Sequence, residues 1–386
     1  MTRTQSFIVF FSIVLSVYAL INTHIFIRGW QAIPDGSPLR PWFAVLFWML
    51  AASFILGRFA ERLTVSWFSS AVVWVGSFWL AAMAYLYLTV LFIDLLRLVN
   101  HFFPFFPALF TRHPEQTRMI TAITVVSAVF LVVLGGHLNA RAPRVRTLDL
   151  AIAKSSPLGS VKIVAATDIH LGTLVCRKFF DSIVDRINAL EPDLVLLPGD
   201  IVDEDLAPVV RQNLGESLRR IRARHGVYAI TGNHEYIGGA EPACRYLSEH
   251  GVTMLRDSTA VVAGGLVLVG REDLSVAHFN GKRRAPLEEV MKDVDRSLPI
   301  LLMDHQPSDL DAAVRNGADV QISGHTHHGQ LWPFGYLAQL VYEVSWGYKK
   351  KGETHIYVSC GVGTWGPPVR TGNRPEIVAM NLRFAK

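Results

Sequence analysis

Residues 161–170 of the chain read VKIVAATDIH. The first seven residues form a short apolar run, typical of a buried strand, and Asp168 and His170 follow it directly. A second apolar run, LVLLPGD (194–200), ends in the same way with Asp200, and the residues between, RKFFDSIVDRINAL (177–190), have helical periodicity. A helix between two buried strands predicts a layered α/β domain.

The same arrangement continues toward the C-terminus. Three more apolar runs end in polar loops, and a fourth ends in glycines: GVYAITGNHE (226–235), LPILLMDHQP (298–307), ADVQISGHTH (318–327) and HIYVSCGVG (355–363). We also expect one amphipathic helix over residues 209–225 and a β-hairpin around Gly264–Gly265.

Aspartate, asparagine and histidine are the residue types that follow these strands. They are Asp168, His170, Asp200, Asn233, His234, His305, His325 and His327. In layered α/β folds, ligands bind at loops beyond the carboxyl ends of strands. Carboxylate, amide and imidazole groups suit hard or borderline divalent cations, and two such cations can clamp a phosphoryl group. A histidine beside them can donate a proton to the leaving oxygen.

The motifs DIH, GDIVDE, GNHE, MDH and GHTH occur in an order and spacing that resembles the calcineurin-like metallophosphoesterase family, over about residues 150–386. The resemblance implies a layered β-sandwich flanked by helices and two divalent metal ions, for which we expect Mn²⁺, with Fe or Zn as alternatives. It assigns Asp168, His170 and His327 to the first metal. Asp200 resembles the bridging carboxylate. Asn233, His305 and His325 resemble the second metal's ligands, and His234 the catalytic histidine.

Other residues have two interpretations each. Arg370, in GPPVR, resembles an arginine near the substrate mouth in related membrane-type members, or it forms a surface salt bridge. Asp203 hydrogen-bonds a ligand side chain or caps a helix, whereas Glu235 is expected to be structural. The tract GYKKKGE (347–353) contacts lipid headgroups or is a solvated loop.

The N-terminal part of the chain has a different composition. Of the 386 residues, 51% are hydrophobic and 18% are charged, below the roughly 25% charge of soluble domains. Four apolar runs are long enough for membrane helices. They are residues 7–27, 42–57, 71–93 and 119–136. We therefore expect a four-helix transmembrane region over residues 1–140 and the phosphoesterase domain over 141–386. The proline-broken stretch 99–117 is either re-entrant or a connecting loop.

Charge placement gives the expected location. Seven basic residues flank the side that holds both chain ends and five flank the other, which favours a cytoplasmic catalytic domain on a multi-pass protein of the bacterial inner membrane. Asp94 is expected at a helix end and His24 near another, so the spans carry no central charge and indicate an anchor rather than a transporter. The net charge of +5 is mostly in the membrane half and does not indicate nucleic-acid binding. Three separated cysteines predict no disulfide framework or thiolate zinc site.

These observations predict a membrane-anchored, binuclear metal-dependent phosphoesterase that hydrolyses a phosphodiester or pyrophosphate bond. The membrane segments followed by NARAPRVR and the DIH domain resemble a bacterial membrane-associated subgroup, which implies a lipid-linked substrate such as UDP-2,3-diacylglucosamine. A phosphomonoesterase or phosphoprotein phosphatase with the same metals is one alternative, and a non-catalytic metal-binding membrane module is another. The sequence indicates no obligate protein partner.

Overall fold

A computed structural model describes residues 3–385 of the chain. The chain divides into two compact units, one ending at Gly135 and the other beginning at Gly136. This division falls a few residues before the expected boundary at residue 140.

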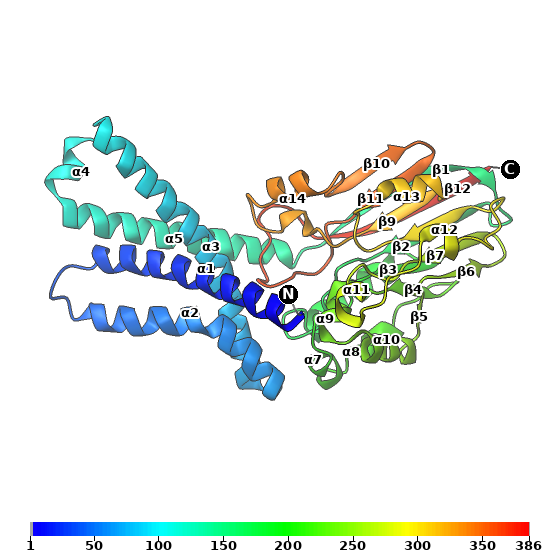
Figure 1. Ribbon diagram of the computed structural model, residues 1–386, viewed down its shortest axis with the longest axis horizontal. Coiled ribbons are helices and arrows are strands. Elements are labelled where there is room, and N and C mark those ends of the chain that lie inside the picture. Colours follow the sequence, from blue (N-terminus) through cyan, green and yellow to red (C-terminus); the bar gives the residue numbers. More distant parts are fainter. Residues whose placement is uncertain (1–2, 386) are drawn as a thin grey trace. The chain divides into compact units, whose positions relative to one another are not determined.

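The first unit consists of long helices, coloured blue to green in Figure 1. They are α1 (Arg3–Ala32), α2 (Leu39–Leu63), α3 (Trp67–Phe102) and α5 (Pro114–Ala140), with the short α4 (Ala108–Arg112) inside the stretch 99–117. Each of the four long helices contains one predicted apolar run and is long and apolar enough to cross a membrane. The prediction of four apolar N-terminal helices is therefore confirmed.

Helices α1 and α3 extend beyond the predicted runs. Asp94 consequently lies within α3, eight residues before its end, and not at a helix end as expected. Its Oδ2 lies 2.9 Å from His24 Nε2 and accepts a hydrogen bond of 2.9 Å from Arg28 Nε, both on α1. A carboxylate paired with a cation can be held within an apolar helix, so the position of Asp94 is compatible with a helix that continues past it.

Two six-stranded sheets form the second unit. The first contains, in spatial order, β1 (Arg144–Ser155), β12 (Glu376–Ala385), β2 (Ser160–Ala165), β3 (Leu194–Pro198), β4 (Val227–Ile230) and β5 (Val252–Met254). The second contains β10 (Gly347–Lys351), β11 (Thr354–Val358), β9 (Val320–Ser323), β8 (Ile300–Met303), β7 (Leu266–Gly270) and β6 (Ser258–Val262). Strands β2 to β5 are parallel, as are β7, β8, β9 and β11, so each sheet presents several carboxyl ends together.

Alternating side chains of each strand supply two cores. In β2, Val161 and Ile163 pack between the sheets, whereas Val164 packs against helices on the outer face. In β8, Leu301 lies between the sheets and Leu302 faces the opposite helices. Full burial of each such side chain contributes about 1.5–3 kcal/mol relative to exposure.

Helices cover both outer faces, which makes the layered α/β sandwich that the sequence predicts (Figure 1). On the first sheet lie α6 (Arg177–Ala189), α7 (Ala207–Arg211), α8 (Leu214–Arg219) and α10 (Ala240–Glu249); on the second lie α12 (Leu287–Val290) and α13 (Leu310–Arg315). The remaining short elements are α9 (Asn233–Gly238), α11 (Val276–Asn280), the 3₁₀ turn η1 (His327–Gly329) and α14 (Gly335–Val341).

One local prediction is wrong and another is confirmed. The single helix expected over 209–225 is instead α7 and α8, because Asn213 between them adopts a left-handed conformation (φ 53°). Asparagine tolerates this conformation more readily than most residues. The expected hairpin exists as antiparallel β6 and β7, with Val262 opposite Leu266 across Gly264–Gly265.

Candidate metal centre

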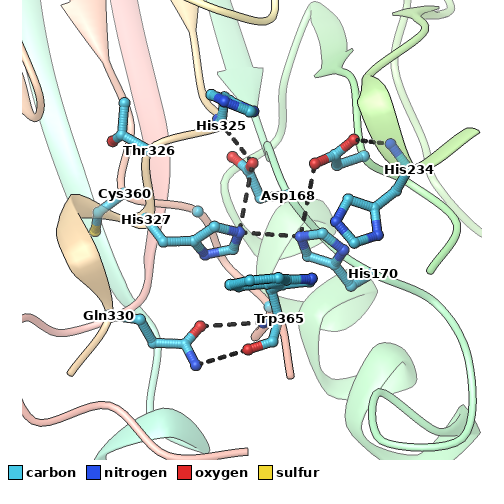
Figure 2. Close-up of polar contacts among 12 residues, drawn as sticks. Asp168, His170, His234, His325, Thr326, His327, Gln330, Cys360 and Trp365 are labelled. Carbon is cyan, nitrogen blue, oxygen red and sulfur yellow. Dashed lines mark hydrogen bonds and ion pairs between the residues drawn. The ribbon is translucent and has the colours of Figure 1, made fainter. Parts of the chain in front are cut away.

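Loops after β2, β3, β4, β8 and β9 bring the predicted polar residues together. Figure 2 shows Asp168, His170 and His327 directed toward one another, with His325 above them and His234 to the right, next to His170. Among the described residues, three groups have ligand atoms within 4.8 Å of one another: Asp168, His170 and His327; Asp200, His305 and His325; and His170, Asp203 and His234.

The first group is buried and directs ligand atoms at a common point. Nε2 of His170 lies 3.0 Å from Nε2 of His327, which is 3.7 Å from Oδ1 of Asp168. Oδ2 of Asp168 is buried and has no hydrogen-bond partner among the described residues. Leaving such an oxygen unsatisfied costs about 1–3 kcal/mol, so its position suits a divalent cation. Burial, then His170 and Arg370, lower the pKa of His327 well below its ordinary value, which keeps this imidazole neutral for metal binding.

The second group meets the first at Asp200. Oδ2 of Asp200 lies 3.2 Å from His305 Nε2 and 3.9 Å from His170 Nε2, so one carboxylate oxygen stands between the two groups. Nδ1 of His305 lies 2.9 Å from the Pro198 carbonyl. Because a carbonyl only accepts, Nδ1 carries a proton and donates to this carbonyl, which orients Nε2 toward Asp200. Burial raises the pKa of Asp200, but His305 and His234 outweigh it and hold the pKa well below the usual range.

Asn233 and His325 complete the second group. Nδ1 of His325 lies 2.8 Å from the side-chain oxygen of Asn233, which is the first residue of α9. The pKa of His325 is lowered by burial and by His305, so this imidazole is also neutral. Carboxylate, amide and imidazole donors in two adjoining groups fit two divalent cations.

The backbone around these residues is strained. Asp168, His170, Asp200, His325 and His327 all have φ between 44° and 70°. Such values are uncommon for residues other than glycine and concentrate at functional sites. A Cβ on Gly232 would overlap Oδ1 of Asp200, and one on Gly324 would overlap Oδ2 of Asp168. Only glycine therefore allows the chain to pass this close to the two carboxylates.

Glu235 holds two of the ligand loops together. Its carboxylate accepts backbone hydrogen bonds of 2.7–3.1 Å from Asp200, Ile201, Val202 and Gly232. Burial, then Asp200, raise the pKa of this carboxyl group. These contacts agree with the structural role expected for this residue.

His234 lies against Asp200 and Asp203. Its backbone N–H donates to Oδ1 of Asp200 (2.9 Å), and its Nδ1 lies 3.2 Å from Oδ1 of Asp203. Burial lowers the pKa of His234, but the two carboxylates outweigh it and raise the pKa to about 9. Asp203 also lies 3.6 Å from Nδ1 of His170. Of its two interpretations, the contact with ligand side chains matches the structure, because the next helix, α7, begins only at Ala207.

The motifs did not single out Trp365. Its ring lies 6.2 Å from the ring of His234 and is about half exposed (52%). The buried Gln330 holds the loop, because it accepts from Trp365 N (3.0 Å) and donates to Trp365 O (2.9 Å), as Figure 2 shows. A tryptophan in a glycine- and proline-rich loop after a predicted strand is the only sequence signal of this position.

Arg370 lies in the interior of the domain. The side chain is fully buried (0% exposed), which does not match a surface salt bridge, and the substrate contact stays a prediction. Nε and Nη2 donate to the Gly363 carbonyl (3.0 and 2.7 Å), and Nη1 donates to Asn373 Oδ1 (2.5 Å). Nη2 also lies 3.0 Å from Nδ1 of His327. The guanidinium therefore contacts the candidate ligand His327 at Nδ1, while Nε2 of the same ring faces His170.

The lysines of tract 347–353 face acidic side chains. Lys349 pairs with Glu343 (2.8 Å), and Lys350 pairs with Glu353 (3.0 Å). Lys351 lies 2.8 Å from Asp311. Because each cation has a nearby carboxylate, the tract is not the free cationic surface that attraction to anionic headgroups favours.

A two-sheet α/β sandwich with adjoining Asp/His groups at its strand ends is an arrangement that can hold two divalent cations. Residues 161–329 match the family described as "Calcineurin-like phosphoesterase". The chain is 31% identical over 261 residues to an "Uncharacterized metallophosphoesterase" of Aquifex aeolicus, covering 66% of this chain and 98% of that protein. The chain therefore belongs to the calcineurin-like phosphoesterase family, as its motifs indicated.

Two further relatives are similar over part of their length. An "Uncharacterized metallophosphoesterase" of Helicobacter pylori strain J99 is 37% identical over 227 residues, which are 58% of this chain and 60% of that one. A "Transmembrane protein with metallophosphoesterase domain" of Bos taurus is 31% identical over 290 residues, 70% of this chain and 65% of that one. The chain thus spans 60% of the length of the Helicobacter relative, and the similarity to it is a similarity of the matched part.

Proposed function

We propose that this protein is a membrane-anchored, binuclear metal-dependent phosphoesterase that hydrolyses phosphodiester or pyrophosphate bonds. The observation that carries the proposal is the position of Asp200, with Oδ2 3.2 Å from His305 Nε2 and 3.9 Å from His170 Nε2. A carboxylate between two groups of imidazoles suits a cation on each side.

The residues have distinct roles in this proposal. One cation is held by Asp168, His170 and His327, the other by Asn233, His305 and His325, and Asp200 contacts both. When bound, the two cations supply electrostatic stabilisation of the phosphoryl group and lower the pKa of water. Mn²⁺ is the expected metal and Fe or Zn the alternatives, because mixed carboxylate and imidazole donors with no thiolate suit this range.

His234 is the proposed proton donor to the leaving oxygen. Asp203 faces its Nδ1 at 3.2 Å, which leaves Nε2 for the substrate and fixes the orientation of the ring. With a pKa raised to about 9 by Asp200 and Asp203 against the effect of burial, the ring holds a proton at neutral pH.

A diester or pyrophosphate is favoured over a monoester. A monoester dianion carries one more negative charge than a diester, and arginine is well suited to bind phosphate, but the buried Arg370 directs its donors to protein acceptors. The half-exposed Trp365 instead offers an apolar surface beside His234. Together with the four apolar helices, it supports a lipid-linked substrate such as UDP-2,3-diacylglucosamine. In this proposal the helices cross the bacterial inner membrane with the catalytic domain in the cytoplasm.

The test uses the purified full-length protein with Mn²⁺. Hydrolysis of bis-p-nitrophenyl phosphate, p-nitrophenyl phosphate and a UDP-linked diacyl sugar is compared for the wild type, for Asp200→Asn and for Asp311→Asn, an exposed aspartate in the same domain (56%). We expect faster turnover of the diester or the UDP-lipid than of the monoester, and loss of about 10²-fold or more in Asp200→Asn only. Faster monoester turnover would favour a phosphomonoesterase or phosphoprotein phosphatase. Metal binding without hydrolysis of any substrate would favour a non-catalytic module.

A further inference from the structure

An uncharged segment follows the candidate ligand His327. Residues 329–342 read GQLWPFGYLAQLVY and contain no charged side chain. Helix α14 lies within this segment, coloured orange in Figure 1, and every one of its residues is at least partly exposed. Leu340 is 83% and Val341 73% exposed, and Trp332 just before the helix is 58% exposed. Apolar groups this exposed and this close together mark an interaction surface.

The exposed apolar residues share one face of α14. Tyr336, Leu337, Leu340 and Val341 stand at positions i, i+1, i+4 and i+5, which lie side by side on a helix of 3.6 residues per turn. Gln339 is also exposed and lies outside this group, about 100° around the helix from Leu340. We call Trp332 and these four residues the α14 face.

The α14 face is fixed next to the metal centre. Thr326, between His325 and His327, donates its hydroxyl hydrogen bond to the Ser345 carbonyl (2.5 Å). Nδ1 of His328 lies 3.0 Å from the Ser345 hydroxyl. Gly329 touches the backbone of Phe334 so closely that a Cβ there would overlap it. The segments before and after α14 are therefore both fastened to the loop that carries two candidate ligands.

The same segment is bonded to a loop that contacts the end of a candidate membrane span. Trp332 N donates to the Thr371 hydroxyl (3.0 Å), and Thr371 N donates to the Gln330 carbonyl (3.1 Å). One residue earlier, Arg370 N donates to the Gly136 carbonyl (2.9 Å), and Asn139 Nδ2 donates to the Arg370 carbonyl (2.9 Å). These residues all belong to the second unit, and Gly136 and Asn139 lie in the last turns of α5, the fourth candidate span.

We propose that the α14 face is a membrane-interfacial surface that seats the catalytic domain on the phospholipid bilayer beside the end of α5. Tryptophan and tyrosine favour the headgroup level, while leucine and valine reach the acyl boundary, so this composition suits a helix lying in the interface plane. The bilayer is the occupant because the α14 segment is bonded, through the loop at Arg370 and Thr371, to the helix that carries the fourth candidate span. The surface is uncharged, so binding does not depend on anionic lipid.

The first test measures the depth of α14 in a bilayer. Full-length protein with Cys176→Ser, which leaves only the buried Cys244 and Cys360, receives a nitroxide at Leu340→Cys or, as the matched control, at Gln339→Cys. In phosphatidylcholine nanodiscs we expect the label at 340 to collide more with oxygen than with a water-soluble nickel chelate, and the order to be reversed at 339. Equal nickel accessibility at both positions would overturn the proposal. The measured accessibility of the label needs no hydrolysis, so the result tests the membrane surface independently of the proposed function.

The second test introduces negative charge into the α14 face by substitution with aspartate. Leu337→Asp with Leu340→Asp should raise nickel accessibility of a label at Val341→Cys in nanodiscs, whereas Gln339→Asp should not, and soluble diester hydrolysis should stay unchanged in both. Other occupants give different results. Dipolar broadening between labels at 340 on two copies would identify a second copy of the chain, and protection that appears only when a lipid-linked substrate is added would identify its acyl chain. Either result would overturn the bilayer as the occupant.

Discussion

Arg370 Nη2 lies 3.0 Å from Nδ1 of His327, with both side chains buried. The other donors of this guanidinium are directed to Gly363 and Asn373, so its position is fixed. The arginine therefore determines where the imidazole of a candidate ligand points, and we assign it a positioning role.

Replacing this arginine should weaken one metal site. Arg370→Ala removes the guanidinium that contacts Nδ1 of His327. Loss of such a contact to a metal ligand typically lowers metal affinity by about 10–100-fold. Titration of metal-free full-length protein with Mn²⁺ should show one weakened site in Arg370→Ala and unchanged sites in Arg315→Ala, an exposed arginine (64%). Loss of catalytic turnover with both Mn²⁺ affinities intact would instead support the substrate contact that the sequence indicated.

Gly232 should not tolerate a methyl group. A Cβ at this position overlaps Oδ1 of Asp200 and would displace the carboxylate that lies between the two groups. A misplacement of about 1 Å can cost about 10²-fold in rate, so Gly232→Ala should lower diester hydrolysis by that order. Gly135→Ala is the control, because its added methyl group meets no atom within 4 Å. Equal rates for the two variants would mean that the position of Asp200 is not critical.

Glu235 should be needed for stability. Glu235→Ala leaves four buried backbone N–H groups without their acceptor, at about 1–3 kcal/mol each before relaxation. We expect the free energy of unfolding to fall by about 3 kcal/mol or more, measured by denaturant unfolding of the protein in detergent. Glu353→Ala, at a 91% exposed carboxylate, should change it by less than about 0.5 kcal/mol. A similar change in the free energy of unfolding in both variants would mean that the hydrogen bonds accepted by Glu235 do not stabilise the domain.

His234 should affect turnover and leave metal content unchanged. His234→Ala removes the proposed proton donor, which typically contributes about 10²–10⁴-fold, while the candidate ligands remain. Turnover of bis-p-nitrophenyl phosphate and bound Mn²⁺ are measured on the same samples. His225→Ala, at a histidine outside the motifs, is the control. Full activity in His234→Ala would remove this residue from the mechanism.

The sequence predicted the residues whose placement is local. Asp168 and Asp200 directly follow buried strands, so the strand pattern was enough to place both at one edge of the sheet. The hairpin of β6 and β7 was equally local, since only the three residues Ala263, Gly264 and Gly265 separate its strands.

Features that depend on distant contacts were not predictable. Strand β1 pairs in parallel with β12, whose residues lie more than two hundred positions later, and no local pattern encodes that pairing. The burial of Arg370 and the position of Trp365 arise because the loop after β11 folds back onto Gln330 and His327. Similarly, Arg28 on α1 donates to Asp94 on α3, a contact between helices far apart in the sequence that no local pattern shows.

Metal stoichiometry of Asp200→Asn tests the central claim most directly. Native mass spectrometry of the Mn²⁺-loaded full-length protein should find two ions per chain in the wild type and in Asp311→Asn. In Asp200→Asn it should find fewer than two, together with the loss of diester hydrolysis. Two ions and full hydrolysis in Asp200→Asn would contradict the account, because the carboxylate between the two groups would then be dispensable.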